Sequence, residues 1–198
     1  LAEVLQKHKN IQEVKLKTNV ENLEIVPADT WLERVELSGD LAADRYSHEK
    51  LKSIVSQLDY DFVIIDTPPS LCWLTESALI AADYSLICTT PEFYSIKGLE
   101  RLSQFINNIN QRHPVEILGV VVSFWNQRGK SNAAFLEVIE STFPDKIFET
   151  KIRRDISVSE AAIYGKPLYE TAPMSRAATD YRALTEEIIS RMSCTVHD

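Results

Sequence analysis

The residues of this sequence with the clearest chemical potential are Asp66 and the Thr67-Pro68-Pro69 run that follows it. They end the stretch YDFVIIDTPPS, in which four consecutive apolar residues precede the aspartate. A continuous apolar run is typical of a strand buried on both faces. An aspartate at the end of such a strand can hold a magnesium ion that bridges nucleotide phosphates. The alternative is that Asp66 only caps a helix predicted to start near Leu74, and the pattern alone weights the two interpretations equally.

A magnesium-holding aspartate needs a phosphate-binding loop nearby. The pattern G-x-x-x-x-G-K-[ST] wraps phosphates with backbone N–H groups and neutralises them with its lysine. Residues 128–131, Arg-Gly-Lys-Ser, end in the required three residues, but Phe124 stands where the first glycine is needed. No G-x-G-x-x-G motif occurs in residues 1–198 either. We therefore interpret residues 126–132 as a polar turn that precedes a helix.

Strand and helix patterns alternate around this aspartate. Strands are predicted at residues 23–28, 61–66, 84–90, 117–124 and 146–152. Helices are predicted at residues 2–9, 47–58, 75–83, 96–110, 132–143, 157–165 and 175–192. This alternation predicts an α/β fold with a doubly wound, mostly parallel sheet flanked by helices. Ligands of such sheets bind outside the carboxyl ends of the strands, where Asp66 is expected to lie.

The composition excludes several classes of protein. The net charge is −8 and the pI is near 5.1, so the chain is not coated in basic charge, although one face can still be basic. The three cysteines, Cys72, Cys88 and Cys194, are far apart and lack metal-ligand spacing, which predicts free thiols rather than a zinc or iron–sulfur site. The apolar runs are of strand length, so no membrane span is predicted.

Six blocks of the sequence carry a resemblance to a known family. They are NLEIVPA (22–28), YDFVIIDTPPSL with LTESALIAAD (60–83), TPEFYSIKGLERL (90–102), ILGVVVSF (117–124), KIFETKIRRDISVSEAAIYGKP (146–167) and MSRAATDYRALTEEI (174–188). In this order they resemble the ParA/Soj/MinD group of deviant-Walker ATPases. The chromosome- and plasmid-partition branch fits best, and chlamydial ParA-type proteins look closest.

The resemblance implies a P-loop NTPase-like fold whose phosphate loop, K-G-G-x-x-K-T, would precede residue 1. Residues 1–198 are therefore expected to be a single ParA-like ATPase domain that is N-terminally truncated and lacks its Walker A segment. The first strand of that segment lies near the middle of the family's sheet. Without it we expect exposed apolar faces and unpaired strand edges, and an open or self-associated structure.

The resemblance also implies roles for individual residues. Asp66 resembles the Walker B aspartate that acts on magnesium, while Thr67 and Pro68 resemble the switch II segment that senses the γ-phosphate. Asn126 and the pair Ile152-Arg153 occupy the segments that contact adenine. The family commonly has Pro-Arg at the second of these segments, where this chain has two arginines, so the individual base contacts stay open.

Basic residues of the family bind DNA without sequence specificity, several of them near the C-terminal helices. The candidates here are Lys151, Arg153, Arg154, Lys166, Arg176, Arg182 and Arg191. Such residues would contact the charged phosphate backbone of DNA rather than its bases. Binding is therefore expected to weaken steeply as the salt concentration rises. For each residue the alternative is an ordinary solvated surface charge.

The resemblance as a whole implies a cytoplasmic, nucleoid-associated and magnesium-dependent ATPase. ATP would be held between the two subunits of a homodimer, the dimer would bind non-specific DNA, and a ParB-like partner protein would trigger hydrolysis. Residues 1–198 alone are expected to be inactive, because the catalytic lysine belongs to the phosphate loop.

A second hypothesis is a non-catalytic DNA- or protein-interaction module with the same fold. A third hypothesis is another member of the deviant-Walker group. A nitrogenase-iron-protein-like ATPase needs a pair of cluster cysteines, which does not occur in residues 1–198. A septum-placement ATPase needs a membrane-targeting tail, which does not occur in them either, so no membrane attachment is expected.

Overall fold

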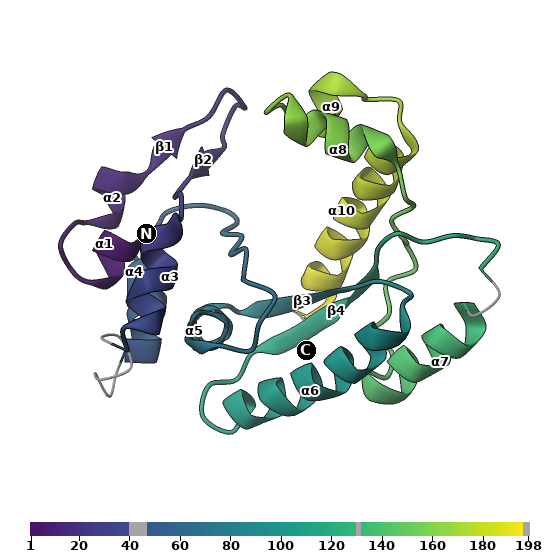
Figure 1. The fold of residues 1–198 in the computed structure, drawn as a ribbon, viewed down its shortest axis with the longest axis horizontal. Helices are drawn as coiled ribbons and strands as arrows, with labels where there is room; N and C mark the ends of the chain where they lie inside the picture. The colour runs from purple at the N-terminus through teal and green to yellow at the C-terminus, as the bar shows by residue number, and fades with distance from the viewer. Residues whose placement is uncertain (40–46, 130–131, 196–198) are drawn as a thin grey trace. The chain divides into compact units, whose positions relative to one another are not determined.

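The computed structural model describes residues 1–39, 47–129 and 132–195 of the chain. Two compact units make up the structure (Figure 1). Unit 1 consists of Leu1–Asp83 and Ile109–Val115, and unit 2 of Tyr84–Asn108 and Glu116–Asp198. The single-domain interpretation of residues 1–198 stays a prediction.

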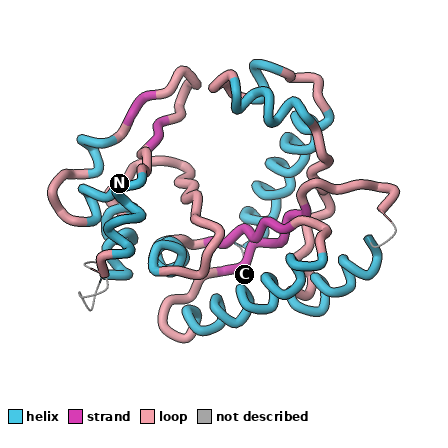
Figure 2. Tube along the Cα trace, in the orientation of Figure 1, coloured by secondary structure: helices cyan, strands magenta, loops and turns pink. Residues whose placement is uncertain are grey.

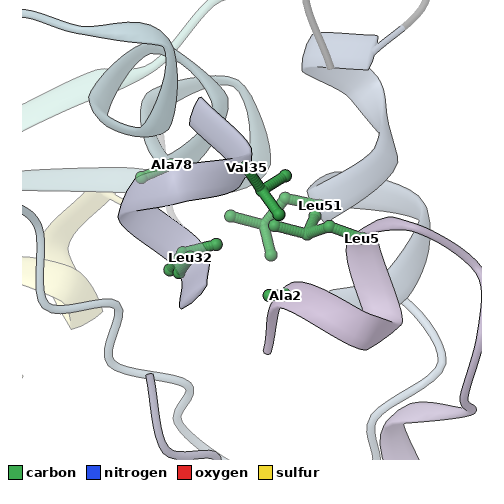
Figure 3. Packing of buried hydrophobic residues seen from close by; sticks show 6 residues of the cluster. All are labelled: Ala2, Leu5, Leu32, Val35, Leu51 and Ala78. Carbon is green, nitrogen blue, oxygen red and sulfur yellow. The ribbon is translucent and has the colours of Figure 1, made fainter. Parts of the chain in front are cut away.

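Unit 1 is mainly helical. Its elements are α1 (Ala2–Leu5), α2 (Ile11–Val14), β1 (Leu16–Lys17), β2 (Glu24–Ile25), α3 (Thr30–Leu37), the 3₁₀ helix η1 (Ser47–Glu49), α4 (Lys50–Val55) and α5 (Trp73–Ala81). Asp29 is the N-cap residue of α3, and its side chain accepts a hydrogen bond from the Trp31 N–H, as N-cap aspartates commonly do. Figure 3 shows Leu5, Val35 and Leu51 converging from α1, α3 and α4, and burial of this apolar cluster holds the short helices together.

Unit 2 contains the parallel strands of the fold. Its elements are β3 (Tyr84–Thr89), α6 (Phe93–Asn110, whose last two residues belong to unit 1), β4 (Glu116–Val122), α7 (Asn132–Thr142), α8 (Ile156–Ile163), α9 (Leu168–Thr171) and α10 (Arg176–Thr195). β3 and β4 pair in parallel, with Thr89 opposite Val122 (Figure 2). Two parallel bridges, Val120–Ile147 and Trp125–Arg153, place residues 147–153 on the other side of β4. The sheet core comprises Leu118, Val121, Phe148, Ile152 and Leu184.

Several predicted elements are confirmed. β3, β4, α5, α6, α7, α8 and α10 lie within a few residues of their predicted bounds. The apolar face predicted for α6 is buried at Leu99, Ile106 and Ile109. Other elements are shorter than predicted: the strand at 23–28 is reduced to β2, and the helix at 2–9 ends at Leu5, because Lys7 adopts a left-handed φ of 61°.

The prediction of a buried strand at residues 61–66 is wrong for this structure. Phe62, Val63 and Ile64 are 58%, 42% and 93% exposed. Within the described part of the chain, no backbone–backbone hydrogen bond involves residues 61–69. A strand forms only where a neighbour takes up its N–H and C=O groups, and the described residues supply none here. The expected exposure of apolar side chains and unpaired backbone is confirmed.

Glu187 and Arg191 of α10 fasten the helix to the segment beside β4. The Glu187 carboxylate accepts hydrogen bonds from the N–H groups of Glu149 (2.8 Å) and Thr150 (2.9 Å). The Arg191 guanidinium donates to the carbonyl oxygens of Lys146 (3.2 Å) and Ile147 (2.7 Å). The Lys146 carbonyl oxygen also accepts a hydrogen bond from the Val120 N–H of β4, and together these bonds stabilise the position of residues 146–150.

The Glu187 contacts predict a loss of stability in acid. Burial alone would raise the pKa of Glu187, but the two backbone N–H donors and Arg191 outweigh it, and the net pKa lies below its ordinary value of 4.5. A carboxyl group with a lowered folded-state pKa stabilises the fold above the unfolded-state pKa and loses that contribution as the pH falls through the folded-state pKa. We therefore expect the free energy of unfolding to fall below about pH 4.5, and to fall less in Glu187→Gln. Urea denaturation between about pH 7 and pH 3 measures this, and parallel curves for the two proteins would rule the role out.

Candidate functional site

Asp66 lies exposed in unit 1. Among the described residues, no hydrogen bond or ion pair reaches it. The neighbouring Thr67 is exposed and Pro68 is half-buried. A carboxylate that no protein group neutralises keeps its oxygen lone pairs for a cation or for ordered water.

The capping alternative for Asp66 is wrong. Cys72 is the N-cap residue of α5. The N–H of Leu74, in the first turn of α5, donates to the Glu36 carboxylate of α3 at 3.1 Å. The hydroxyl of Thr75 donates to the Ser70 carbonyl at 2.6 Å. The start of α5 is therefore held without Asp66, and metal binding by Asp66 stays a prediction.

Asn126 lies in a turn at the carboxyl end of β4. Its side-chain oxygen accepts a hydrogen bond from the Arg128 N–H at 3.1 Å, and its carbonyl oxygen accepts one from the Gly129 N–H at 2.9 Å. Asn132 then begins α7. The interpretation of residues 126–132 as a polar turn before a helix is confirmed for the described positions, while Lys130 and Ser131 lie outside them.

Ile152 and Arg153 lie beside this turn. The Ile152 carbonyl oxygen accepts a hydrogen bond from the Trp125 N–H at 2.9 Å, and the Ile152 side chain is buried. Unit 2 thus brings together the two segments that the resemblance assigns to adenine contact, at the carboxyl end of its sheet. Asp66 belongs to unit 1.

The Arg153 guanidinium is engaged by Asp180 of α10. It donates from Nη2 to one carboxylate oxygen at 2.6 Å and from Nε to the other at 2.9 Å. The Arg153 N–H donates to the same carboxylate at 2.9 Å. The hydrogen bonds to Asp180 raise the pKa of Arg153, so this arginine stays charged and fixed toward α10.

The other candidate cations divide into two groups. The Lys151 ammonium donates to the carbonyl oxygens of Phe148 (2.6 Å) and Glu149 (3.0 Å), and burial lowers the pKa of Lys151. Arg154 and Lys166 are exposed. The Arg176 side chain is 66% exposed and lies 3.9 Å from the Asp155 carboxylate. Geometry therefore leaves Arg154, Lys166 and Arg176 accessible to a polyanion, whereas Lys151 and Arg153 have internal partners.

Sequence reasoning missed the carboxylates that organise unit 2. Asp180 lies 27 residues from its partner Arg153, a separation that no local pattern signals. The Glu187–Arg191 pair has i,i+4 spacing, which does predict an ion pair on a helix face.

The described residues include no group of three or more histidine, cysteine, aspartate or glutamate side chains placed to hold a metal ion. None of the helices in the described ranges combines the length and hydropathy that crossing a bilayer requires.

Comparison with known proteins finds a matching family model and close sequence relatives. A family model described as "AAA domain" matches residues 1–117. The ParA family protein of Chlamydia trachomatis serovar D is 65% identical over 191 residues, which cover 96% of this chain and 75% of that protein. The chromosome partitioning protein ParA of Caulobacter vibrioides is 32% identical over 96% of this chain and 73% of its own length.

A solved structure confirms the fold class. A complex of Cyanothece McdA with ATP superimposes with a TM-score of 0.82 at 19% identity, covering 94% of this chain and 74% of that chain. The expected α/β, P-loop NTPase-like fold is thereby confirmed. At this level of sequence identity the similarity extends to the fold alone. The sequence relatives carry the assignment further: the chain belongs to the ParA family.

Proposed function

We propose that this chain is the ATPase domain of a DNA-partition protein, a nucleotide-switched homodimer that hydrolyses ATP with Mg²⁺. The observation that carries the proposal is Asp66, an aspartate without a protein partner among the described residues that directly precedes Thr67-Pro68 in a ParA-family chain. A site of this kind suits magnesium, which takes oxygen ligands from one or two carboxylates, from water and from nucleotide phosphates. A complete set of protein ligands is therefore not needed.

Each candidate residue has a defined task in this proposal. Asp66 holds the ion, which neutralises charge on the phosphates when bound. Thr67 and Pro68 respond to the γ-phosphate, and Asn126 with Ile152 and Arg153 frames the adenine. The proposal requires a phosphate-binding loop from outside residues 1–198, because these residues contain no Walker A pattern. For the same reason residues 1–198 alone are expected to be inactive.

DNA binding is proposed for the exposed cations of unit 2. Arg154, Lys166 and Arg176 are accessible, and contacts with phosphates by such side chains need no base sequence. A ParB-like protein is the proposed trigger of hydrolysis, and the nucleoid within the cytoplasm is the proposed location. The relative from Caulobacter vibrioides, a chromosome partitioning protein by name, supports the partition role.

Substitution of Arg154 is expected to change DNA binding, whereas substitution of Arg153 is expected to change the stability of the fold. Arg154→Gln removes one phosphate contact, so the slope of log K against log salt concentration should become shallower by about 1. Arg153→Gln removes the guanidinium that pairs with the buried Asp180 and should lower the free energy of unfolding by about 3 kcal/mol, since the carboxylate keeps the Arg153 N–H but loses its cationic partner. Binding titrations at several salt concentrations, together with urea denaturation, measure the two effects.

Arg101→Gln, which removes an exposed cation of α6, is the matched control for Arg154→Gln and should leave the salt slope unchanged. An unchanged slope in Arg154→Gln would remove Arg154 from the DNA-binding surface.

The test that separates the ATPase from a non-catalytic interaction module is the dependence of dimerisation on nucleotide. We expect the protein expressed from its complete reading frame to be a dimer with ATP and Mg²⁺ and a monomer without them, as measured by light scattering. DNA binding without any nucleotide-dependent dimerisation would favour the module. That hypothesis draws support from segment 61–69, which forms no backbone–backbone hydrogen bond with the described residues and whose exposed apolar residues suit a protein partner.

A further inference from the structure

Asp180 of α10 fixes both the backbone and the side chain of Arg153. Its carboxylate accepts a hydrogen bond from the Arg153 N–H at 2.9 Å, and it pairs with Nε and Nη2 of the guanidinium at 2.9 and 2.6 Å. The Asp180 side chain is only 11% exposed. Charge-assisted hydrogen bonds are short and directional, so a carboxylate that holds the main chain and the side chain of one residue restricts the motion of both.

The residues on either side of Arg153 are also fastened. Before it, the Ile152 N–H donates to the Val122 carbonyl oxygen of β4 at 2.9 Å. After it, the Asp155 carboxylate accepts a hydrogen bond from the Ala177 N–H, in the first turn of α10, at 3.3 Å. β4 therefore holds the beginning of this short segment, and α10 holds the rest of it.

This fixed backbone leaves one acceptor available. No backbone N–H of the described residues donates to the Arg153 carbonyl oxygen. Arg153 bridges to Trp125, directly before the turn at Asn126, at the carboxyl end of the sheet where ligands of such folds bind. The exocyclic amino group of adenine is a hydrogen-bond donor, whereas guanine carries an acceptor at the same position. A carbonyl oxygen held in place there suits adenine.

We propose that Asp180 is a positioning residue for adenine binding, which holds Arg153 so that the main chain at the end of the sheet is already arranged for the base. Asp180 acts through Arg153 alone. The inference rests on the adenine-framing role proposed above for Ile152 and Arg153, and it adds the residue that keeps them in place. A segment that is ordered before binding loses little entropy when the ligand arrives, so loosening it weakens binding of the base.

The test uses the protein expressed from its complete reading frame, in the presence of Mg²⁺. Asp180→Asn keeps the size of the side chain and removes its charge. The Kd for a non-hydrolysable ATP analogue, measured by calorimetry, should rise about tenfold, which corresponds to the loss of about one hydrogen bond. KM for ATP should rise by a similar factor while kcat changes less than about twofold, because ground state and transition state lose the same base contact.

Glu187→Gln is the matched control. Glu187 lies seven residues further along α10, about 10.5 Å along the helix axis, and its carboxylate also holds backbone N–H groups, those of Glu149 and Thr150. The substitution therefore weakens a comparable contact of the same helix at a distance from the base-binding segment. It should lower the stability of the fold but leave Kd and KM within about twofold of the wild type.

A double variant tests whether Asp180 acts through Arg153. Arg153→Gln keeps the N–H donor and should raise the Kd less than Asp180→Asn does. Arg153→Gln combined with Asp180→Asn should bind the analogue within about twofold of Asp180→Asn alone, because both changes break one shared contact. The double variant leaves no guanidinium without its carboxylate, so it reports on binding even if Asp180→Asn folds poorly.

The outcomes separate this inference from the proposed ATPase. An unchanged Kd in Asp180→Asn would overturn the positioning role, and so would a lower kcat at constant KM, which a smaller folded fraction alone would produce. Equal effects of Glu187→Gln and Asp180→Asn on the Kd, or additive effects in the double variant, would also overturn it. Each of these results leaves nucleotide binding intact. No binding of the ATP analogue by the wild type would overturn both.

Discussion

Asp66→Asn is expected to lower the rate of ATP hydrolysis by about 100-fold or more in the protein expressed from its complete reading frame. A magnesium ion held by Asp66 would supply several kcal/mol of stabilisation to the developing charge, and each 1.4 kcal/mol is about a tenfold change in rate. Asparagine keeps the size of the side chain but removes its negative charge, which is what attracts the ion. Because Asp66 is exposed and has no protein partner among the described residues, the free energy of unfolding should change by less than about 0.5 kcal/mol.

Asp61→Asn is the matched control for this experiment. Asp61 is an exposed aspartate of the same stretch, on the amino-terminal side of the apolar run. Its substitution should leave the turnover within about twofold of the wild type. Steady-state phosphate release over a range of Mg²⁺ concentrations measures both variants. Equal activity of Asp66→Asn and the wild type would exclude Asp66 as the metal-holding residue.

Gly119→Ala is expected to lower the free energy of unfolding by about 3 kcal/mol, because β4 has no room for a side chain at this position. A Cβ atom on Gly119 would lie 2.7 Å from the Lys146 carbonyl oxygen and 2.7 Å from Nη1 of Arg191, and it would overlap the Phe148 ring. The first neighbour is backbone that pairs with β4, so relief requires residues 146–148 to move away from the strand. Arg191 would then lose its hydrogen bonds to the same segment.

Gly98→Ala provides the contrast within the same unit. Gly98 lies in α6, and a Cβ atom there would meet nothing within 4 Å. Alanine is the better helix former by about 1 kcal/mol, so this variant should be slightly more stable than the wild type. Urea denaturation monitored by circular dichroism compares the two. If Gly119→Ala unfolded at the wild-type urea concentration, the close approach of residues 146–148 to β4 would be wrong.

Two apolar runs with the same pattern have different structures, and the difference shows the limit of sequence reasoning here. Residues 117–124 and 61–66 both predict buried parallel strands. The first becomes β4, because β3 and residues 147–153 flank it on both sides. The second has no pairing strand among the described residues and stays exposed. A local pattern of apolar residues predicts that a segment can form a buried strand. Whether it does so depends on a pairing strand from elsewhere in the chain, which the local pattern does not predict.

The same distinction applies to the candidate site. The pattern alone left two interpretations of Asp66 open, and only the resemblance assigned it to magnesium, a role that stays a prediction. Arg153 was grouped with Arg154 as a DNA-binding cation, since adjacent arginines look alike in a sequence. Only the fold shows that Arg153 faces Asp180 while Arg154 faces Phe124. Pairings across 27 or more residues depend on how helices pack, which composition and spacing do not encode.

The central claim, that this ParA-family chain belongs to a magnesium-dependent ATPase, is tested most directly by ATP turnover. Phosphate release is measured for the protein expressed from its complete reading frame and for residues 1–198 alone, each with Mg²⁺ and with EDTA. We predict turnover by the complete protein with Mg²⁺, its loss in EDTA, and none from residues 1–198 alone under either condition. Turnover that persists in EDTA, or magnesium-dependent turnover by residues 1–198 alone, would contradict this account.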